Sequence, residues 1–429
     1  MQNFVDSSGK FAVDLFKQQI NKSYGKNLIS FSVGGQLSLA LLLLGSKKET
    51  ADEITKAKGS LWEQVTVGLT FVGSHSEQIG MSPMGWKALR FLKSAGTGTA
   101  ADESLSGSEC DKSGGFHTWF NQLLSALRQP SKYRMLKMAS RIYGSKAYHF
   151  LEQYEKCIKE LYNCELESVD FMNANEEVRR KINSWVERKT NGEITNFFPA
   201  NSIDRSTALV LLNTVYFQGM WKRPFNPKDT QRGIFWTCKD QSMYVDMMTQ
   251  KGRFNIANIS NPPMTVVEME YENEELSMIF LVPESSISTD EIITNLTYER
   301  LQEWTDPGNM KNVAIKLSMP KFSVQNQYPL KGLFSEMGVK NLFIPGKADL
   351  SGMTGNNQLV VSQIFQAFAF TVSEEGSEVS GASRTEVVSG SHSDVKINKP
   401  FWFALKHKRT NVTLCLGRIC EPNWKGHPK

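Results

Sequence analysis

Apolar side chains recur at helical spacing through the first part of the chain. Phe11, Leu15, Phe16 and Ile20 fall on one face of an α-helix. The stretch from Gln36 to Leu44 is almost wholly apolar, which predicts a helix buried in a core. Residues 1–58 are therefore expected to be helical.

Beyond residue 116 the pattern alternates between helix and strand and then turns to strand. Helices are predicted at 116–127, 151–165 and 175–190, and strands at 134–143, 207–217, 264–271, 276–282, 313–319, 359–373 and 401–417. The run 207–217 is continuously apolar, as expected of a central strand covered on both faces. Thr190-Asn191-Gly192 is a helix stop signal, and 264–271 with 276–282 predicts a hairpin. Helices followed by strands indicate one large α+β unit.

Composition supports a globular chain and excludes several classes of protein. The 429 residues are 40% hydrophobic and 22% charged, and the net charge of +5 is spread without blocks. We therefore expect no nucleic-acid binding and, without a run of about 18 apolar residues, no membrane span. Asp6, Lys10, Asp14 and Lys17 interrupt any secretory leader. This predicts a cytoplasmic protein, with extracellular release by a non-classical route as the alternative.

Motifs for metal binding and for enzymatic chemistry do not assemble. The six cysteines form no CxxC pair, and without a leader the default expectation is that they stay reduced. Cys157 and Cys164 are spaced as packed thiols on one helical face. The histidines are scattered, and no HExxH, GxSxG, Walker or GxGxxG motif is present. We expect neither a metal nor a cofactor, and the protein is predicted not to be an enzyme.

Residues 73–115 interrupt the series of predicted helices and strands. The segment is rich in glycine and serine and is predicted to be an inserted interhelical loop. Within it, residues 86–93 place Trp86 and two leucines beside three basic side chains, typical of a short amphipathic helix that contacts a partner or a membrane surface. Eight residues are too few for an independent helix, so a local cap on the domain is the preferred interpretation.

A long polar segment from Ser373 to Asp394 shows a regular alternation. Small uncharged residues occupy the odd positions Ser377, Val379, Gly381, Ser383, Thr385 and Val387, while charges fall on the even positions Glu378, Arg384 and Glu386. Successive side chains of a strand point to opposite faces, so this loop has one face that a sheet could bury. The pattern predicts a segment that is a loop in one state and a central strand in another.

Several blocks of sequence together resemble the serpin family, from end to end apart from the 73–115 insert. They are Ile182–Gly192, Asn213–Trp221 followed by Pro224-Phe225, Met319–Phe322, Ala348–Gly352, and Pro400–Phe403 with Leu414–Arg418 and Pro422. The leaderless amphipathic start is similar to the intracellular, ovalbumin-type branch. The resemblance implies a single domain over 1–429, with about nine helices on three β-sheets and an exposed reactive-centre loop within 374–397.

The resemblance also implies suicide-substrate inhibition of a protease, by a monomer. In this family the target protease becomes acylated on the reactive loop, which then inserts into the central sheet, releases stored strain and distorts the captured enzyme. About a dozen residues gaining ~1 kcal/mol each in hydrogen bonds amount to something on the order of 10 kcal/mol. This rivals the stability of a whole domain.

Carried over residue by residue, the resemblance assigns the hinge and the reactive bond. The hinge comprises Glu375, Gly376, Ser377, Glu378, Val379, Ser380, Gly381, Ala382 and Ser383. Counting the family's usual spacing forward from Gly376 places the reactive bond at Gly390-Ser391. Counting back from 398–401 places it at Ser389-Gly390.

Either register places a very small residue before the reactive bond, which favours an elastase-like or a cysteine protease over a trypsin-like one. Arg384 is the alternative trypsin site, but it leaves only about 26 Å of insertable strand, against roughly 46 Å for the full loop. Cleavage there is expected to destroy the inhibitor.

The chain departs from the family pattern at three places. Val379 stands where alanine is usual, Phe31-Ser32-Val33-Gly34 replaces Ser-Pro-x-Ser, and Gln366 replaces histidine in the sheet-opening region, which also contains Asn213. A non-inhibitory serpin acting as a binding, chaperone or storage protein is therefore the alternative. Heparin binding through Lys132, Arg134 and Lys137 is not expected, because three charges more often form a solvated face.

Overall fold

A computed structural model describes most of the chain. The described residues are 2–23, 25–57, 110–111, 115–132, 134–272, 274–284, 289–375 and 393–423. Most of the 73–115 insert, including the basic segment 86–93, lies outside them. So do the hinge from Gly376 to Ser383, Arg384, and the predicted reactive bond at 389–391.

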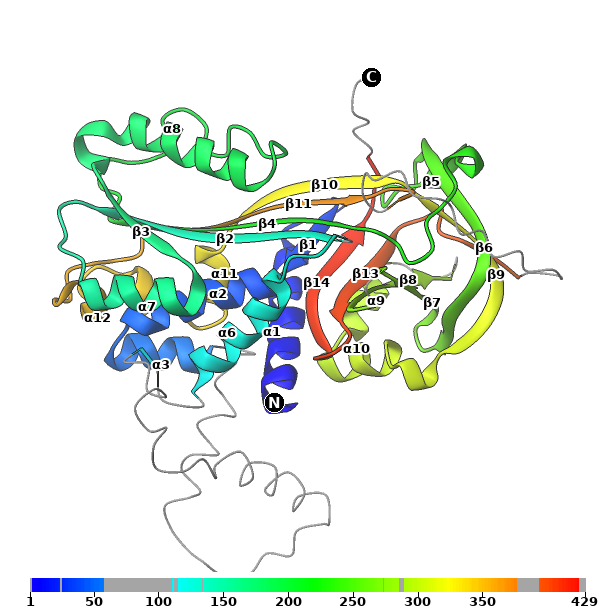
Figure 1. Ribbon diagram of the computed structural model, residues 1–429, viewed down its shortest axis with the longest axis horizontal. Coiled ribbons are helices and arrows are strands. Elements are labelled where there is room, and N and C mark those ends of the chain that lie inside the picture. The colour runs from blue at the N-terminus through cyan, green and yellow to red at the C-terminus, as the bar shows by residue number, and fades with distance from the viewer. Residues whose placement is uncertain are drawn as a thin grey trace, which may run out of the picture.

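One sheet of five strands crosses the molecule (Figure 1). Its order is β10 (Phe322–Pro329), β11 (Gln363–Val372), β4 (Leu209–Gly219), β2 (Arg134–Ser145) and β3 (Glu165–Val169). The continuously apolar run predicted at 207–217 is β4, and its side chains from Leu209 to Phe217 are buried. Helix α8 (Phe171–Lys189) covers one face of the sheet, and α2 (Ser32–Gly45) lies beneath the other.

The remaining described strands form one continuous nine-stranded sheet, so the described strands make two sheets where three were expected. Its members are β1 (Leu28–Phe31), β14 (Val412–Ile419), β13 (Phe401–His407), β8 (Leu276–Pro283), β7 (Pro263–Glu270), β6 (Ser242–Ser260), β9 (Lys311–Pro320), β12 (Ser393–Lys396) and β5 (Gln231–Trp236). The long strand β6 joins the two parts, because its end pairs with β7 and its middle pairs with β9. The predicted hairpin is confirmed as β7 and β8.

The described residues form ten α-helices, close to the expected number. Besides α2 and α8 they are α1 (Gln2–Asn21), α3 (Lys48–Lys56), α6 (Phe116–Arg128), α7 (Glu152–Tyr162), α9 (Thr289–Asn295), α10 (Tyr298–Trp304), α11 (Lys331–Glu336) and α12 (Ser351–Thr354), with 3₁₀ turns at Pro227–Asp229, Pro307–Asn309 and Asn341–Phe343. Helix α8 ends at the predicted stop signal, where Asn191 and Gly192 take positive φ. In the described part of the chain, every helix is too short or too polar to cross a bilayer.

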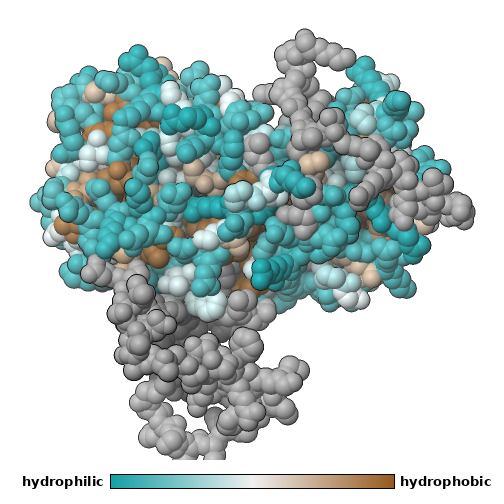
Figure 2. Space-filling model, in the orientation of Figure 1, coloured by the Kyte–Doolittle hydropathy of each residue, from teal (hydrophilic) through white to brown (hydrophobic). Residues whose placement is uncertain are grey.

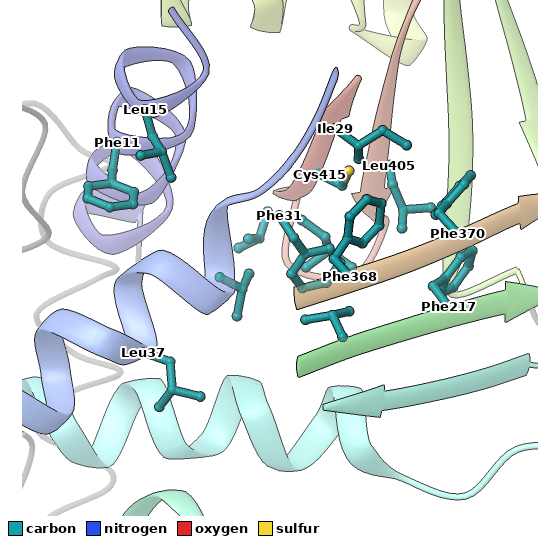
Figure 3. Packing of buried hydrophobic residues seen from close by; sticks show 14 of the residues in the cluster. Phe11, Leu15, Ile29, Phe31, Leu37, Phe217, Phe368, Phe370, Leu405 and Cys415 are labelled. Atoms are coloured by element: carbon teal, nitrogen blue, oxygen red, sulfur yellow. The ribbon is translucent and has the colours of Figure 1, made fainter. Parts of the chain in front are cut away.

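The main core lies where α2 meets both sheets (Figure 3). The predicted apolar helix is α2, which is buried along nearly its whole length. Phe370 of β11 stacks on Phe217 of β4 and on Phe403 of β13, with ring centroids 5.3 and 5.5 Å apart. Each such fully buried ring stabilises the fold by about 1.5–3 kcal/mol, so the strands of the central sheet are held tightly against the second sheet. On the surface, Figure 2 shows a mainly hydrophilic face with apolar side chains in small separate groups.

Several predictions about local structure were wrong. Residues 1–58 are not all helical, because Leu28–Phe31 form the strand β1, which pairs with β14. The region 401–417 is not one strand but the hairpin β13–β14, which turns at 408–411 with Asn411 at φ 56°. The cysteines are not all reduced, because Cys110–Cys157 and Cys238–Cys420 are disulfides. Their partners are 47 and 182 residues apart, so only the tertiary fold brings them together.

Cys164 and Cys415 are buried free thiols. Cys164 was expected to share a helical face with Cys157, but α7 ends at Tyr162 and Asn163 turns the chain with φ 51°. Burial raises the pKa of both thiols, which keeps them protonated and unreactive at neutral pH.

Alkylation in urea tests the disulfide pairing. Without reductant two thiols should react, and after reduction all six should react. Reduction should also lower the unfolding midpoint, since each bridge stabilises by up to about 4 kcal/mol through the unfolded chain. Six reactive thiols without reductant would contradict the pairing. The control Cys164→Ser leaves both bridges intact, so this variant should have one reactive thiol without reductant.

Candidate functional site

The seam between β11 and β4 is the centre of the candidate site. The two strands run parallel, with Gln363 opposite Val210 at one end and Phe370 opposite Phe217 at the other. Strand β11 then continues through Glu375 into the predicted reactive loop. A segment that turned back at this point and lay between the two strands would be antiparallel to both. Antiparallel ladders are slightly more stable per residue than parallel ones, so the seam can accept a strand of this direction.

The predicted sheet-opening residues lie directly opposite each other across this seam. Gln366 of β11 and Asn213 of β4 are register partners, and both are buried. The Gln366 amide Nε2 donates to the Phe31 carbonyl at 2.8 Å. The Asn213 amide Nδ2 donates to Ser38 Oγ at 2.5 Å, and its Oδ1 accepts from Ser140 Oγ. Both strands of the seam are thus bonded to α2 or to the residue that precedes it.

The unusual residues at this position fit one another. A Cβ added at Gly34 would lie 2.2 Å from Gln366 Nε2, so the long amide occupies the space that a side chain at position 34 would need. Ser32 Oγ donates to the Thr413 carbonyl at 3.0 Å and fixes the start of α2 to β14. Two of the departures from the family pattern, Gly34 and Gln366, are therefore sterically complementary.

The end of β11 is fastened to the chain that follows β4. The Trp221 indole Nε1 donates to the Ser373 carbonyl at 3.0 Å, and the Trp221 backbone N–H donates to the Glu375 carbonyl at 3.2 Å. The Phe225 N–H donates to the Glu374 carbonyl at 2.8 Å. Trp221 itself stacks on Tyr271 with ring centroids 4.5 Å apart. The residues immediately before the hinge are therefore held in one position.

A buried ion pair reinforces this fastening. The Glu374 carboxylate lies 2.9 Å from Lys321 Nζ and accepts from Thr230 Oγ1 at 2.8 Å. Glu374 is only 8% exposed. Because water is largely excluded here, losing this contact should cost more than losing an exposed ion pair. This pair was not predicted: Lys321 stands inside one of the recognised sequence blocks, but nothing local indicates its partner.

A second charge cluster lies beside Trp221. Lys222 pairs with Glu270 at 2.8 Å and with Glu274 at 2.7 Å, and Lys408 also contacts Glu270. The hydrogen bonds that Lys222 donates to Glu270 and Glu274 raise the pKa of Lys222. Burial acts to raise the pKa of Glu270, but Lys222 and Lys408 outweigh it and lower that pKa. Lys222 and Glu270 therefore stay ionised at neutral pH.

The described residues include only part of the predicted site. Glu375, Gln366 and Asn213 are described, and the other hinge residues and the reactive bond are not. Arg134, one of the three residues weighed for heparin, is buried and pairs with Glu275 at 3.2 Å. Among the described residues, no cluster of three or more His, Cys, Asp or Glu side chains could hold a metal.

The fit between Gly34 and Gln366 can be tested with a double-mutant cycle. Gly34→Ser should lower the unfolding free energy by about 1–3 kcal/mol, because the new side chain collides with the amide. Adding Gln366→Ala, which removes the amide from this space, should recover part of this loss. Urea unfolding of the four proteins would measure the coupling, and additive effects would contradict the fit.

Glu374→Gln should destabilise the protein by about 1–3 kcal/mol, since it removes the charge of the carboxylate that Lys321 Nζ and Thr230 Oγ1 contact in a mostly buried place. Thermal unfolding would measure the loss. Glu299→Gln is the matched control, because its pair with Lys10 is long, at 3.9 Å, and exposed; its effect should stay within about 1 kcal/mol. Equal effects of the two substitutions would contradict the role given to Glu374.

Comparisons with known proteins agree with this geometry. A family model described as "Serpin (serine protease inhibitor)" matches residues 6–422. Human serpin B3 is 35% identical over 428 residues and human serpin B4 is 34% identical over 426, each alignment covering 98% of this chain and 100% of the relative. The crystal structure of uncleaved ovalbumin matches with a TM-score of 0.77 at 27% identity, covering 98% of this chain and 100% of that one. The chain therefore belongs to the serpin family.

Proposed function

We propose that this serpin is a suicide-substrate inhibitor of a serine endopeptidase, with a cysteine protease as the second target class. The cleaved reactive loop would insert between β11 and β4 and trap the acyl-enzyme. The observation that carries the proposal is the parallel β11–β4 seam, because the loop leaves the end of β11 in the position from which it can turn back into that seam.

Insertion would exchange one parallel ladder for two antiparallel ones. The loop's backbone groups would each gain partners in the sheet. At ~1 kcal/mol per net hydrogen bond over about a dozen residues, the gain is on the order of 10 kcal/mol. Part of it is offset by the cost of separating β11 from β4 and of moving Gln366 and Asn213 over α2. The intact form is then kinetically trapped.

The hinge and the reactive bond keep the assignments given by the family resemblance. Gly376 allows the backbone to turn and Ser377 is small enough to enter the sheet first. The reactive bond is assigned to Ser389-Gly390 or Gly390-Ser391, which favours an elastase-like or a cysteine protease. In either register the residues after the bond run into β12, which is paired with β9 from Ser393 opposite Ile315. The new C-terminal fragment would therefore stay in its sheet after cleavage.

The two disulfides bear on where the protein acts. Disulfides persist in oxidising compartments and are rare in the cytosol. Cys110–Cys157 and Cys238–Cys420 therefore favour the extracellular alternative over the cytoplasmic expectation. We further propose a monomer that needs no heparin, since burial of Arg134 leaves the considered basic group incomplete.

The first test is a thermal melt of the intact protein against protein nicked once within 384–391. The unfolding midpoint should rise by tens of degrees, because the freed loop becomes a central strand. Elastase-like proteases should then form covalent complexes that survive denaturing gels.

Ser377→Glu is the matched control, since a charge on the buried face opposes insertion. This variant should be cleaved without a rise in the midpoint and without forming complexes. An unchanged midpoint of the nicked parent protein would overturn the proposal in favour of a non-inhibitory binding, chaperone or storage serpin.

A further inference from the structure

A hollow lies between helix α6 and the end of helix α7. The two helices are neighbours (Figure 1), and Phe120 of α6 contacts Tyr162 of α7 with ring centroids 6.1 Å apart. The walls of the hollow come from α6 and the two residues after it, and from residues 160–163 at the end of α7. Its volume is about 310 Å³, which is at the lower end of the range for small-molecule sites in proteins.

Arg128, the last residue of α6, lines this hollow with a partly buried side chain. Its Nε and Nη2 atoms are buried, and neither has a hydrogen-bond partner among the described residues. Burial disfavours the charged form and lowers the pKa of Arg128, but a guanidinium still stays charged in proteins. Burying charged donors without partners costs free energy, so this arrangement points to a ligand that accepts from them.

The two atoms without partners define the shape of that ligand. In an arginine side chain, the Nε–H group and one N–H of Nη2 point the same way along one edge of the planar guanidinium. This edge matches two oxygens of one carboxylate or one phosphate, which accept both hydrogen bonds at once. A water molecule could also accept from this edge, but it would leave the buried charge uncompensated.

The groups around Arg128 do not supply this charge. In the part of the chain that the structure describes, no carboxylate forms an ion pair with Arg128. Glu160 also lines the hollow, but its side chain is exposed and its Oε2 lies 3.7 Å from Cys110 Sγ. The Cys164 thiol is close to Arg128, but burial raises the pKa of Cys164 and keeps the thiol neutral at pH 7.

Uncharged groups of the hollow are suited to the same ligand. The side-chain amides of Gln129 and Asn163 line it, and each amide has two N–H donors. The Glu160 carbonyl at the end of α7 already accepts from Asn121 Nδ2 at 3.3 Å, which occupies one of the acceptors nearby. The hollow therefore combines one buried cation with several polar donors on its walls.

We propose that this hollow binds a small oxyanion, a phosphate or a carboxylate, through Arg128 Nε and Nη2, with Gln129 and Asn163 as further donors. The inference does not depend on the proposed function. The volume admits a small organic acid or a phosphate ester as well as free phosphate. The three residues weighed for heparin, Lys132, Arg134 and Lys137, do not line the hollow, so the proposed site is separate from that group.

Thermal unfolding of the full-length protein at pH 7 tests the site. Phosphate and acetate are each titrated into a Tris chloride buffer, and sodium chloride keeps the ionic strength at about 0.3 M so that screening stays constant. At least one of the two anions should raise the unfolding midpoint by about 2–5 °C and reach saturation. A response to phosphate alone, to acetate alone or to both would identify which oxyanion the hollow accepts.

Variants of Arg128 separate binding from general stabilisation by salts, which acts on every variant alike. Arg128→Gln should lose the saturable rise. Arg128→Lys keeps the charge but not the two-donor edge, so its apparent affinity should fall at least about tenfold. The matched control is Arg188→Gln, which removes an exposed arginine from the last turn of α8 and should respond like the parent protein.

The midpoints in chloride alone give a second, independent readout. Arg128→Gln should unfold at the same temperature as the parent protein or higher, because it removes a buried charge that the described residues leave without a partner. A midpoint lower by several degrees would show that other protein groups already satisfy the guanidinium, which would overturn the proposal. Equal responses of the parent protein and Arg128→Gln to both anions, or no response to either, would also overturn it and leave the hollow to water.

Discussion

The parallel pairing of β11 with β4 is the constraint on which the rest of the structure depends. Parallel strands need long connections. Here β11 lies beside β4, which comes much earlier in the sequence. The sequence after β11 is long, polar and alternating in side-chain size, and under the proposed function this segment would lie antiparallel to both strands of the seam. The contacts around the seam hold β11 and β4 together, and the proposed function requires that they can be exchanged.

Three sets of contacts hold β11 and β4 together. They lie at the middle of the seam and at the end of β11. Gln366 and Asn213 connect the middle of the seam to α2 beneath the sheet. Trp221 and the Glu374–Lys321 pair fasten the top, where the loop departs. None of these contacts is a covalent bond, so each can be exchanged for others in a rearranged sheet. The disulfides lie elsewhere, at the ends of the insert and of β14, and do not cross the seam.

Sequence patterns predicted those parts of the fold that local periodicity determines. The apolar run of α2, the continuous strand β4, the β7–β8 hairpin and the helix stop at Asn191-Gly192 each depend on neighbouring residues, and each was found where expected. The prediction for 401–417 was wrong although the sequence marks the break, because the polar run 406–411 separates two buried strands and contains the turn.

Features that depend on residues far apart in the chain could not be predicted in this way. The disulfides, the burial of Arg134 and the Glu374–Lys321 pair each join segments that meet only in the folded protein. Gln366 and Asn213 were assigned to the sheet-opening region by resemblance, but their direct opposition and the space left by Gly34 are visible only in three dimensions. The hinge and the reactive bond remain predictions from the sequence.

A crystal structure of the protein nicked once within 384–391 would test the central claim most directly. We predict that the segment after Glu375 forms a new strand between β11 and β4, antiparallel to both, with Ser377, Val379, Gly381 and Ser383 on its buried face. Gln366 and Asn213 should then no longer be register partners. A nicked protein in which β11 and β4 keep the register of Gln363 opposite Val210 would contradict the claim that the seam is built to accept the loop.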